Sequence, residues 1–255
     1  MKKYNSLNGN IVTKKEIDYL IKTRDIPLWM VNSYAEITER LSNSNFPCLF
    51  GRHAWKMETV LFSFISKKRR NEDLISSLSM LTEYTKIKKE EERLHSPLLC
   101  VFEDTNFKSV EEEQSFAWEQ IQYLHDRDIG EWPDSIPEDP ECSEWTFCFN
   151  NIELFINVSC PGHKKIRSRN LGNNIVFVIN PRKHFDIVAN VNDPKGVKIR
   201  EKIRSRVRVY NDDESPLELG FYGDDNNREW KQYALHEPGS AVLVSCPLKM
   251  KKDTR

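Results

Sequence analysis

The sequence lacks the tracts that would mark a membrane, secreted or multidomain protein. No apolar run approaches the roughly 20 residues of a spanning helix, and no apolar segment follows the basic pair Lys2-Lys3 as it would in a secretory signal. The six cysteines form no close pairs and do not make the dense disulfide framework of a small secreted domain. From these absences we expect a soluble, intracellular and cytoplasmic protein. Because no Gly-, Ser- or Pro-rich linker divides the chain, we expect a single domain spanning residues 1–255.

An excess of one charge and the familiar catalytic motifs are missing as well. Lys and Arg number 38 against 39 Asp and Glu, and a net charge of -1 argues against a general polyanion binder. The arginine-rich helix expected over residues 195–209 is interpreted as a solvated face, with no nucleic-acid partner. The chain has no Gly-x-Ser-x-Gly, phosphate-binding Gly loop, His-Glu-x-x-His or Gly-x-Gly-x-x-Gly. Hydrolase, kinase and dehydrogenase functions therefore lose support.

The hydrophobic periodicity that is present indicates an α+β domain. Asn150-Asn151 predicts a tight hairpin between two of the expected strands. We therefore predict a mixed, largely antiparallel sheet with helices packed over it, beginning with an N-terminal helical layer within residues 1–45. Helical spacing occurs over residues 14–41 with a break near Pro27, and over 71–84, 109–125 and 195–209. Strands are predicted over residues 59–65, 97–102, 145–149, 152–156, 174–180 and 241–245.

One histidine and a group of cations follow the strand predicted over residues 152–158. Pro161-Gly162 ends that strand, so His163 leaves the sheet on an irregular segment. A neutral imidazole can ligate a metal, and Arg167 and Arg169 can bind carboxylates by bidentate hydrogen bonds. Haem, with one iron and two propionates, requires this pairing of groups. The alternative is a solvated basic turn without a ligand.

Two interpretations based on cysteine stay open as alternatives to His163 as the haem ligand. Cys160, which precedes a proline, is a rival axial ligand because a thiolate can also bind haem iron. Cys142, Cys148, Cys160 and His163 include the residue types that bind zinc, although only Cys160-x-x-His163 has a compact ligand spacing. Buried thiols are the simpler interpretation of these cysteines.

Two further histidines are candidate site residues. His53 precedes a predicted strand and is a candidate distal or second axial group for a haem. His125 lies near the C-terminus of a predicted helix, where the helix dipole alone favours a histidine. The functional interpretation, in which His125 faces a pocket, and the structural one remain equally open.

Several motifs together give the chain a resemblance to the YqcI/YcgG-like family. The similarity extends from about residue 46 to residue 235 and is specific in combination. The motifs are Phe46-Pro-Cys-Leu-Phe-Gly51, Leu124-His125-x-x-Asp128 with Trp132-Pro133, Trp145-x-Phe147-x-Phe149, Pro161-x-His163-x-x-x-Arg167-Ser168-Arg169, Tyr222-Gly223-Asp224 and Arg228-Glu229-Trp230-Lys231-Gln232-Tyr233.

The resemblance implies haem and oxygen chemistry, since the family includes haem-dependent N-hydroxylases of guanidino compounds such as L-arginine. It makes His163 the leading metal ligand for haem b, with Arg167 and Arg169 as propionate partners. A guanidinium substrate requires a carboxylate partner, for which Glu229 is the first candidate and Asp224 the second.

The same resemblance implies dioxygen as a partner and an external electron donor, either a separate reductase or peroxide. The aromatic residues Trp145, Phe147 and Phe149 are then candidates for a pocket wall. Two rival functions remain: a haem carrier or sensor without turnover, and a non-haem interaction protein.

Overall fold

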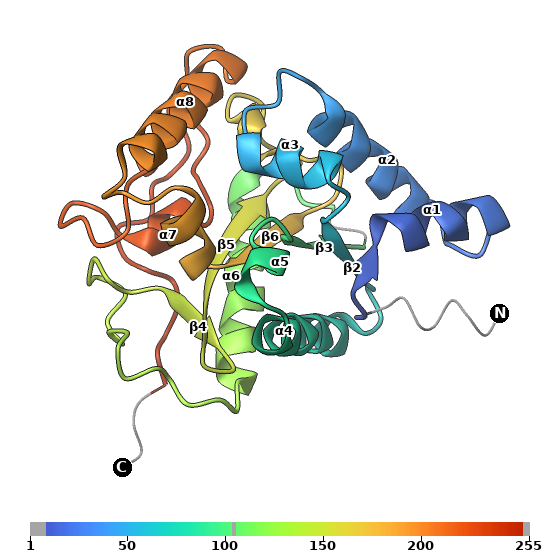
Figure 1. The fold of residues 1–255 in the computed structure, drawn as a ribbon, viewed down its shortest axis with the longest axis horizontal. Helices are drawn as coiled ribbons and strands as arrows, with labels where there is room; N and C mark the ends of the chain where they lie inside the picture. The colour runs from blue at the N-terminus through green and yellow to red at the C-terminus, as the bar shows by residue number, and fades with distance from the viewer. Residues whose placement is uncertain (1–8, 104–105, 252–255) are drawn as a thin grey trace.

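Six strands form one mixed sheet at the centre of the protein (Figure 1). The computed structural model describes residues 9–103 and 106–251, so the Lys2-Lys3 pair lies outside the described residues. The parallel pair β2–β3 is flanked by antiparallel neighbours, which confirms the predicted mixed, largely antiparallel sheet of a single-domain α+β fold. The strand order is β1 (Val12–Thr13), β2 (Leu61–Ile65), β3 (Leu98–Phe102), β6 (Val176–Pro181), β5 (Ile152–Ser159) and β4 (Phe147–Phe149).

Three helices cover one face of β2 and β3: α1 (Lys14–Thr23), α2 (Leu28–Ser42) and α3 (Leu49–Lys56). Thr13 and Glu16 form a capping box that begins α1, and Pro27 precedes α2, so the predicted helical layer and its break are confirmed. Helix α3 was not predicted, because its eight residues are too short for a clear apolar period.

The opposite face of the sheet packs on α4 (Arg70–Ile87) and α6 (Val110–Arg127), while the short α5 (Glu90–Arg93) leads into β3. The Ser109 hydroxyl accepts the backbone N–H of Glu112 and caps α6, and acidic residues in the first turn favour the same end of the helix. In Figure 1, α4 lies below the sheet and α2 and α3 lie above it.

The hairpin of β4 and β5 turns at the two predicted asparagines. Asn150 and Asn151 have φ values of 50° and 63°, as a two-residue turn between twisted strands requires. Beyond β6, α7 (Lys183–Val188) and α8 (Pro194–Tyr210) lie on the same side of the sheet as α3 in Figure 1. Two short 3-10 helices complete the described elements: η2 (Arg167–Arg169) and η3 (Glu229–Gln232).

The strand predicted over residues 241–245 is wrong. This segment has no regular structure, and Val244 is 92% exposed. A β-branched run becomes a strand only where another strand offers unpaired N–H and C=O groups, and no described strand pairs with this segment. None of the helices in the described part of the chain is both long enough and apolar enough to cross a membrane.

Candidate functional site

His163 lies in the turn after β5, where the carboxylate of Glu237 fixes its ring. The Nδ1 atom is 2.9 Å from Oε2 of Glu237, and the carboxylate also accepts the backbone N–H groups of Lys165 and Ile166. Because a carboxylate only accepts, Nδ1 carries the hydrogen. Burial lowers the pKa of His163 against the opposing effect of Glu237, which favours the neutral form of the ring. Its buried Nε2 has no hydrogen-bond partner among the described residues and presents a lone pair, as in a metal-ligating histidine.

Arg167 and Arg169 contact different partners instead of forming one clamp. Arg169 is buried, its Nη2 donates to the carbonyl of Gln232 at 2.9 Å, and its Nη1 has no described partner. Burial lowers the pKa of Arg169 to about 10, which leaves it charged near neutral pH. Arg167 is 44% exposed and its Nη2 lies 2.6 Å from Asp212 Oδ1. Of these two arginines, therefore, only Arg169 has a buried donor without a described partner.

Cys160 is a buried thiol and does not complete a zinc site. Burial, followed by the charge of Glu113, raises the pKa of Cys160 well above its ordinary value. In the described part of the chain, no group of three or more His, Cys, Asp or Glu residues is arranged to hold a metal ion. The geometry supports neither the zinc alternative nor a thiolate at Cys160.

Glu229 lies in a buried polar network that contains a guanidinium from the chain itself. Its carboxylate accepts from the hydroxyls of Thr146 and, at 2.9 Å, Tyr233, and Arg182 Nη1 lies 3.9 Å away. Burial raises the pKa of Glu229 to about 7, although Thr146 and Arg182 oppose the rise. The Glu229 carboxylate is a group that can bind a guanidinium, but the guanidinium of Arg182 already lies beside it. Asp224, the second candidate, lies in an exposed turn.

His125 lines a small pocket together with Asp128 and Trp132, and it also has a structural contact at the end of α6. Its Nε2 accepts the backbone N–H of Lys251 at 3.1 Å, and its ring packs edge-on against Trp132. Burial lowers the pKa of His125, which keeps the acceptor lone pair available. The aromatic residues predicted to form a pocket wall, Trp145, Phe147 and Phe149, belong instead to the core between the sheet, α4 and α6.

A long apolar cavity lies over β5 and β6, between α3 and α7; we call it the β5–β6 cavity. It has two lobes, with volumes of about 80 and 160 Å³. Both lobes are smaller than the roughly 300–1,000 Å³ that is common for ligand pockets in proteins. The two lobes share Cys48, Gly51, Pro97, Asn157 and Val178.

Several polar groups face this apolar cavity. His184 is 3% exposed, and its Nε2 lies 2.6 Å from Arg93 Nη1. Since arginine only donates, the neutral ring carries its hydrogen on Nδ1, which is buried without a described partner. Burial, followed by the charge of Arg93, lowers the pKa of His184 to about 4. His95 also lines the cavity, and the exposed His53 lies beside it with ring centroids 4.6 Å apart.

Sequence reasoning missed Cys48, His95 and His184 as site residues. The available signal was Pro47-Cys48 before a possible helix start, since Cys48 becomes the N-cap of α3. His95 and His184 lie in a loop and a short helix whose positions relative to β5 and β6 depend on the tertiary fold.

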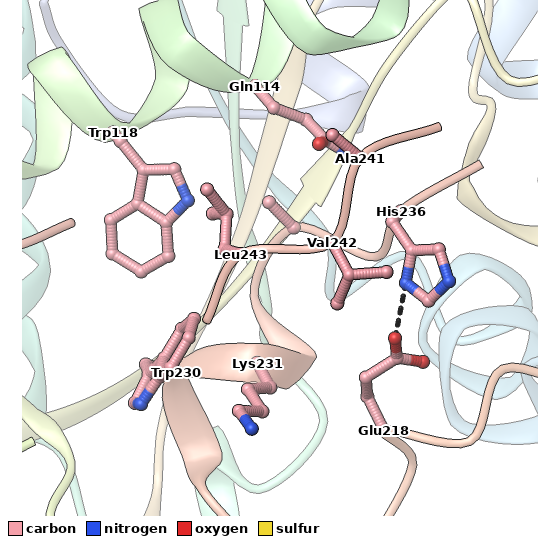
Figure 2. Close-up of a pocket in the computed structure, with 10 residues that line it drawn as sticks. Gln114, Trp118, Glu218, Trp230, Lys231, His236, Ala241, Val242 and Leu243 are labelled. Carbon is pink, nitrogen blue, oxygen red and sulfur yellow. Dashed lines mark ion pairs between the residues drawn. The ribbon is translucent and has the colours of Figure 1, made fainter. Parts of the chain in front are cut away.

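A smaller pocket lies between α6, η3 and residues 241–243 (Figure 2). Trp118 and Trp230 border it, and its volume is about 30 Å³. Glu218 forms an ion pair with His236, and the second carboxylate oxygen of Glu218 is buried without a described partner. A carboxylate and indole rings that line one pocket are groups that can bind an organic cation. Sequence reasoning did not identify Glu218 or His236.

Comparison with known proteins places the chain in a family. A sequence profile of the YqcI/YcgG family matches residues 37–249, and the chain therefore belongs to that family. It is 33% identical over 245 residues to a Streptomyces lavendulae protein named "Putative N(omega)-hydroxy-L-arginine synthase DcsA", covering 94% of this chain and 89% of the relative.

Two Bacillus subtilis (strain 168) proteins of uncharacterised function are also similar. YcgG is 32% identical over 256 residues, covering 97% of each chain. YqcI is 30% identical over 253 residues, covering 94% of this chain and 95% of YqcI. No solved structure matches the chain significantly.

Proposed function

We propose that the protein N-hydroxylates a guanidino compound such as L-arginine, with haem b as its cofactor. The observation that carries the proposal is the similarity over 94% of this chain to a relative with a printed name for this reaction. The β5–β6 cavity, where apolar side chains lie beside a thiol and two imidazoles, is the candidate place for the chemistry. The similarity to a relative named as an N(omega)-hydroxy-L-arginine synthase supports the same chemistry.

The residues around the cavity match a haem in donor type, whereas the two lobes are smaller than a whole haem. Val178, Phe155 and Phe185 offer apolar surface for a macrocycle, while Cys48, His95 and His184 offer candidate iron ligands or hydrogen-bond partners. His163 has the free Nε2 of a metal ligand, but it is absent from the residues that line either lobe. Its role as the axial ligand therefore stays a prediction.

Bound haem would supply the activation of dioxygen. In the overall reaction, one guanidino N–H becomes N–OH, the second oxygen atom leaves as water, and an external donor supplies two electrons with two protons. Peroxide, which already contains those electrons and protons, is the alternative co-substrate. The protein's part is to bind and orient the guanidine and to keep water away from it.

Two amides at the cavity floor are suited to hold the substrate. The side chains of Asn157 on β5 and Asn180 on β6 both line the lobe nearest α7. An amide oxygen accepts from a guanidino N–H without adding a buried charge. Nδ1–H of His184, a donor without a described partner, can hold an oxygen atom nearby.

The test is reconstitution of the purified full chain with hemin, followed by mass spectrometry of reactions with L-arginine, dioxygen and a chemical or enzymatic reductant. A product heavier by one oxygen, absent without haem, is expected, and isotopically labelled dioxygen should label it. Haem absorbance without any hydroxylated guanidine would favour a carrier or sensor. Failure to take up haem would refute the proposal and favour a non-haem interaction protein.

A further inference from the structure

The floor of the β5–β6 cavity is formed by two cross-strand pairs of side chains. Asn157 on β5 lies opposite Val178 on β6, and Phe155 lies opposite Asn180. Because alternate residues of a strand point to the same face of the sheet, these four side chains lie together on the face that lines the cavity. Each pair therefore places one amide group beside one apolar side chain.

The larger lobe of the cavity is about as large as one six-membered ring. Its volume is about 160 Å³, and an engineered apolar cavity of about 150 Å³ in another protein binds benzene. Phe50, Phe155 and Phe185 supply apolar surface for such a ring. No Asp, Glu, Lys or Arg side chain is among the described residues that line either lobe, so an uncharged ligand needs no ionic partner there.

His184 gives this lobe a hydrogen-bond donor that has no partner. Its side chain is 3% exposed and lines the lobe together with Asn157 and Asn180. Arg93 Nη1, which lies 2.6 Å from Nε2, can only donate to it, so the neutral ring has its hydrogen on Nδ1. No described residue accepts from Nδ1. A buried donor without an acceptor is unfavourable, and an oxygen atom of a ligand would satisfy it.

We propose that the larger lobe of the β5–β6 cavity binds an uncharged molecule about the size of one ring that has a hydroxyl group. The hydroxyl oxygen accepts from Nδ1–H of His184, and the hydroxyl donates to the amide oxygen of Asn157 or Asn180. The ring packs on Phe155 and Val178. The inference goes beyond the proposed function and does not rest on it, because neither haem nor turnover is needed. Such a molecule and a guanidine would compete for the same two amides.

The experiment measures the binding of two probes of equal shape, para-fluorophenol and para-fluorotoluene, to the full chain by fluorine NMR. The probes differ only in a hydroxyl that replaces a methyl group. The proteins are wild type, His184→Phe and the matched control His53→Phe, which alters an exposed histidine that lines neither lobe. Circular dichroism checks that each variant is folded. Nuclear Overhauser effects between the probe ring and the methyl groups of Val178 and Val188 locate the bound probe in wild type.

Both probes should bind wild type at millimolar concentration and show contacts to these two valines. The ratio of the two dissociation constants should shift against the phenol by about tenfold in His184→Phe and stay unchanged in His53→Phe. The proposal is overturned if the phenol does not bind wild type, or if it contacts neither valine. An unchanged ratio in folded His184→Phe also overturns it. Since the measurement contains no haem, its result is separate from that of the reconstitution assay for the proposed function.

Discussion

Replacing Glu229 by glutamine should change how the stability of the protein depends on pH. Burial raises the pKa of this carboxyl from 4.5 to about 7 in the folded protein. The folded state therefore binds the proton more tightly than the unfolded chain. The stabilisation that comes from this tighter proton binding is fully present below the unfolded pKa. It is lost as the pH rises from 4.5 through about 7. The difference between the folded and the unfolded pKa of Glu229 corresponds to about 3 kcal/mol of unfolding free energy.

Glu229→Gln removes this proton equilibrium and retains the local hydrogen bonds. Thr146 and Tyr233 both donate to Oε1, which the glutamine amide oxygen can replace. Arg182 loses one neighbour but keeps Asp186 at 2.7 Å. We therefore expect the variant to gain stability relative to wild type as the pH rises.

The assay is urea unfolding of both proteins across a pH series that spans the two pKa values. The free energy of unfolding of wild type minus that of Glu229→Gln should fall by about 3 kcal/mol from the acid to the alkaline end. Asp224→Asn is the matched control, since this carboxyl is exposed. Parallel pH profiles for wild type and Glu229→Gln would refute the reasoning.

Three further substitutions should destabilise the protein in urea unfolding. Tyr233→Phe should cost about 1–3 kcal/mol, because the buried N–H of Phe147 donates to the lost hydroxyl at 3.0 Å; an unchanged midpoint would contradict this. Glu237→Ala should cost about 2–3 kcal/mol, since the carboxylate accepts from the His163 ring and three backbone N–H groups. Gly196→Ala should destabilise although alanine is the better helix former, because its Cβ would lie 2.1 Å from the carbonyl oxygen of Asn190; increased stability would count against that clash.

Matched controls for Tyr233→Phe and Glu237→Ala separate local from general effects. Tyr19→Phe alters a tyrosine that is 58% exposed and should leave stability nearly unchanged. Glu214→Ala removes a partly exposed partner of Lys165, at 3.7 Å, and should cost less than Glu237→Ala.

Local sequence patterns predicted most of the secondary structure. The Asn150-Asn151 hairpin and the capped helix after Ser109 depend on residues close together in the chain, so their signals are complete within a short window. The short α3 was not predicted. Residues 241–245 were wrongly predicted to form a strand. A short helix carries little periodicity, and a strand requires a partner that the local sequence does not specify.

For the candidate site, too, some features could be predicted from the local sequence and others depended on the tertiary structure. The sequence by itself determined the α+β class, the family resemblance and the end of a strand just before Pro161 and Gly162. The role of His163 stays a prediction. Only the tertiary structure decided that Arg182 forms an ion pair with Glu229. It also decided that Cys48 and His184 line the same cavity. Burial and pairing between distant segments arise from how the helices pack on the sheet. Local residue patterns do not contain that information.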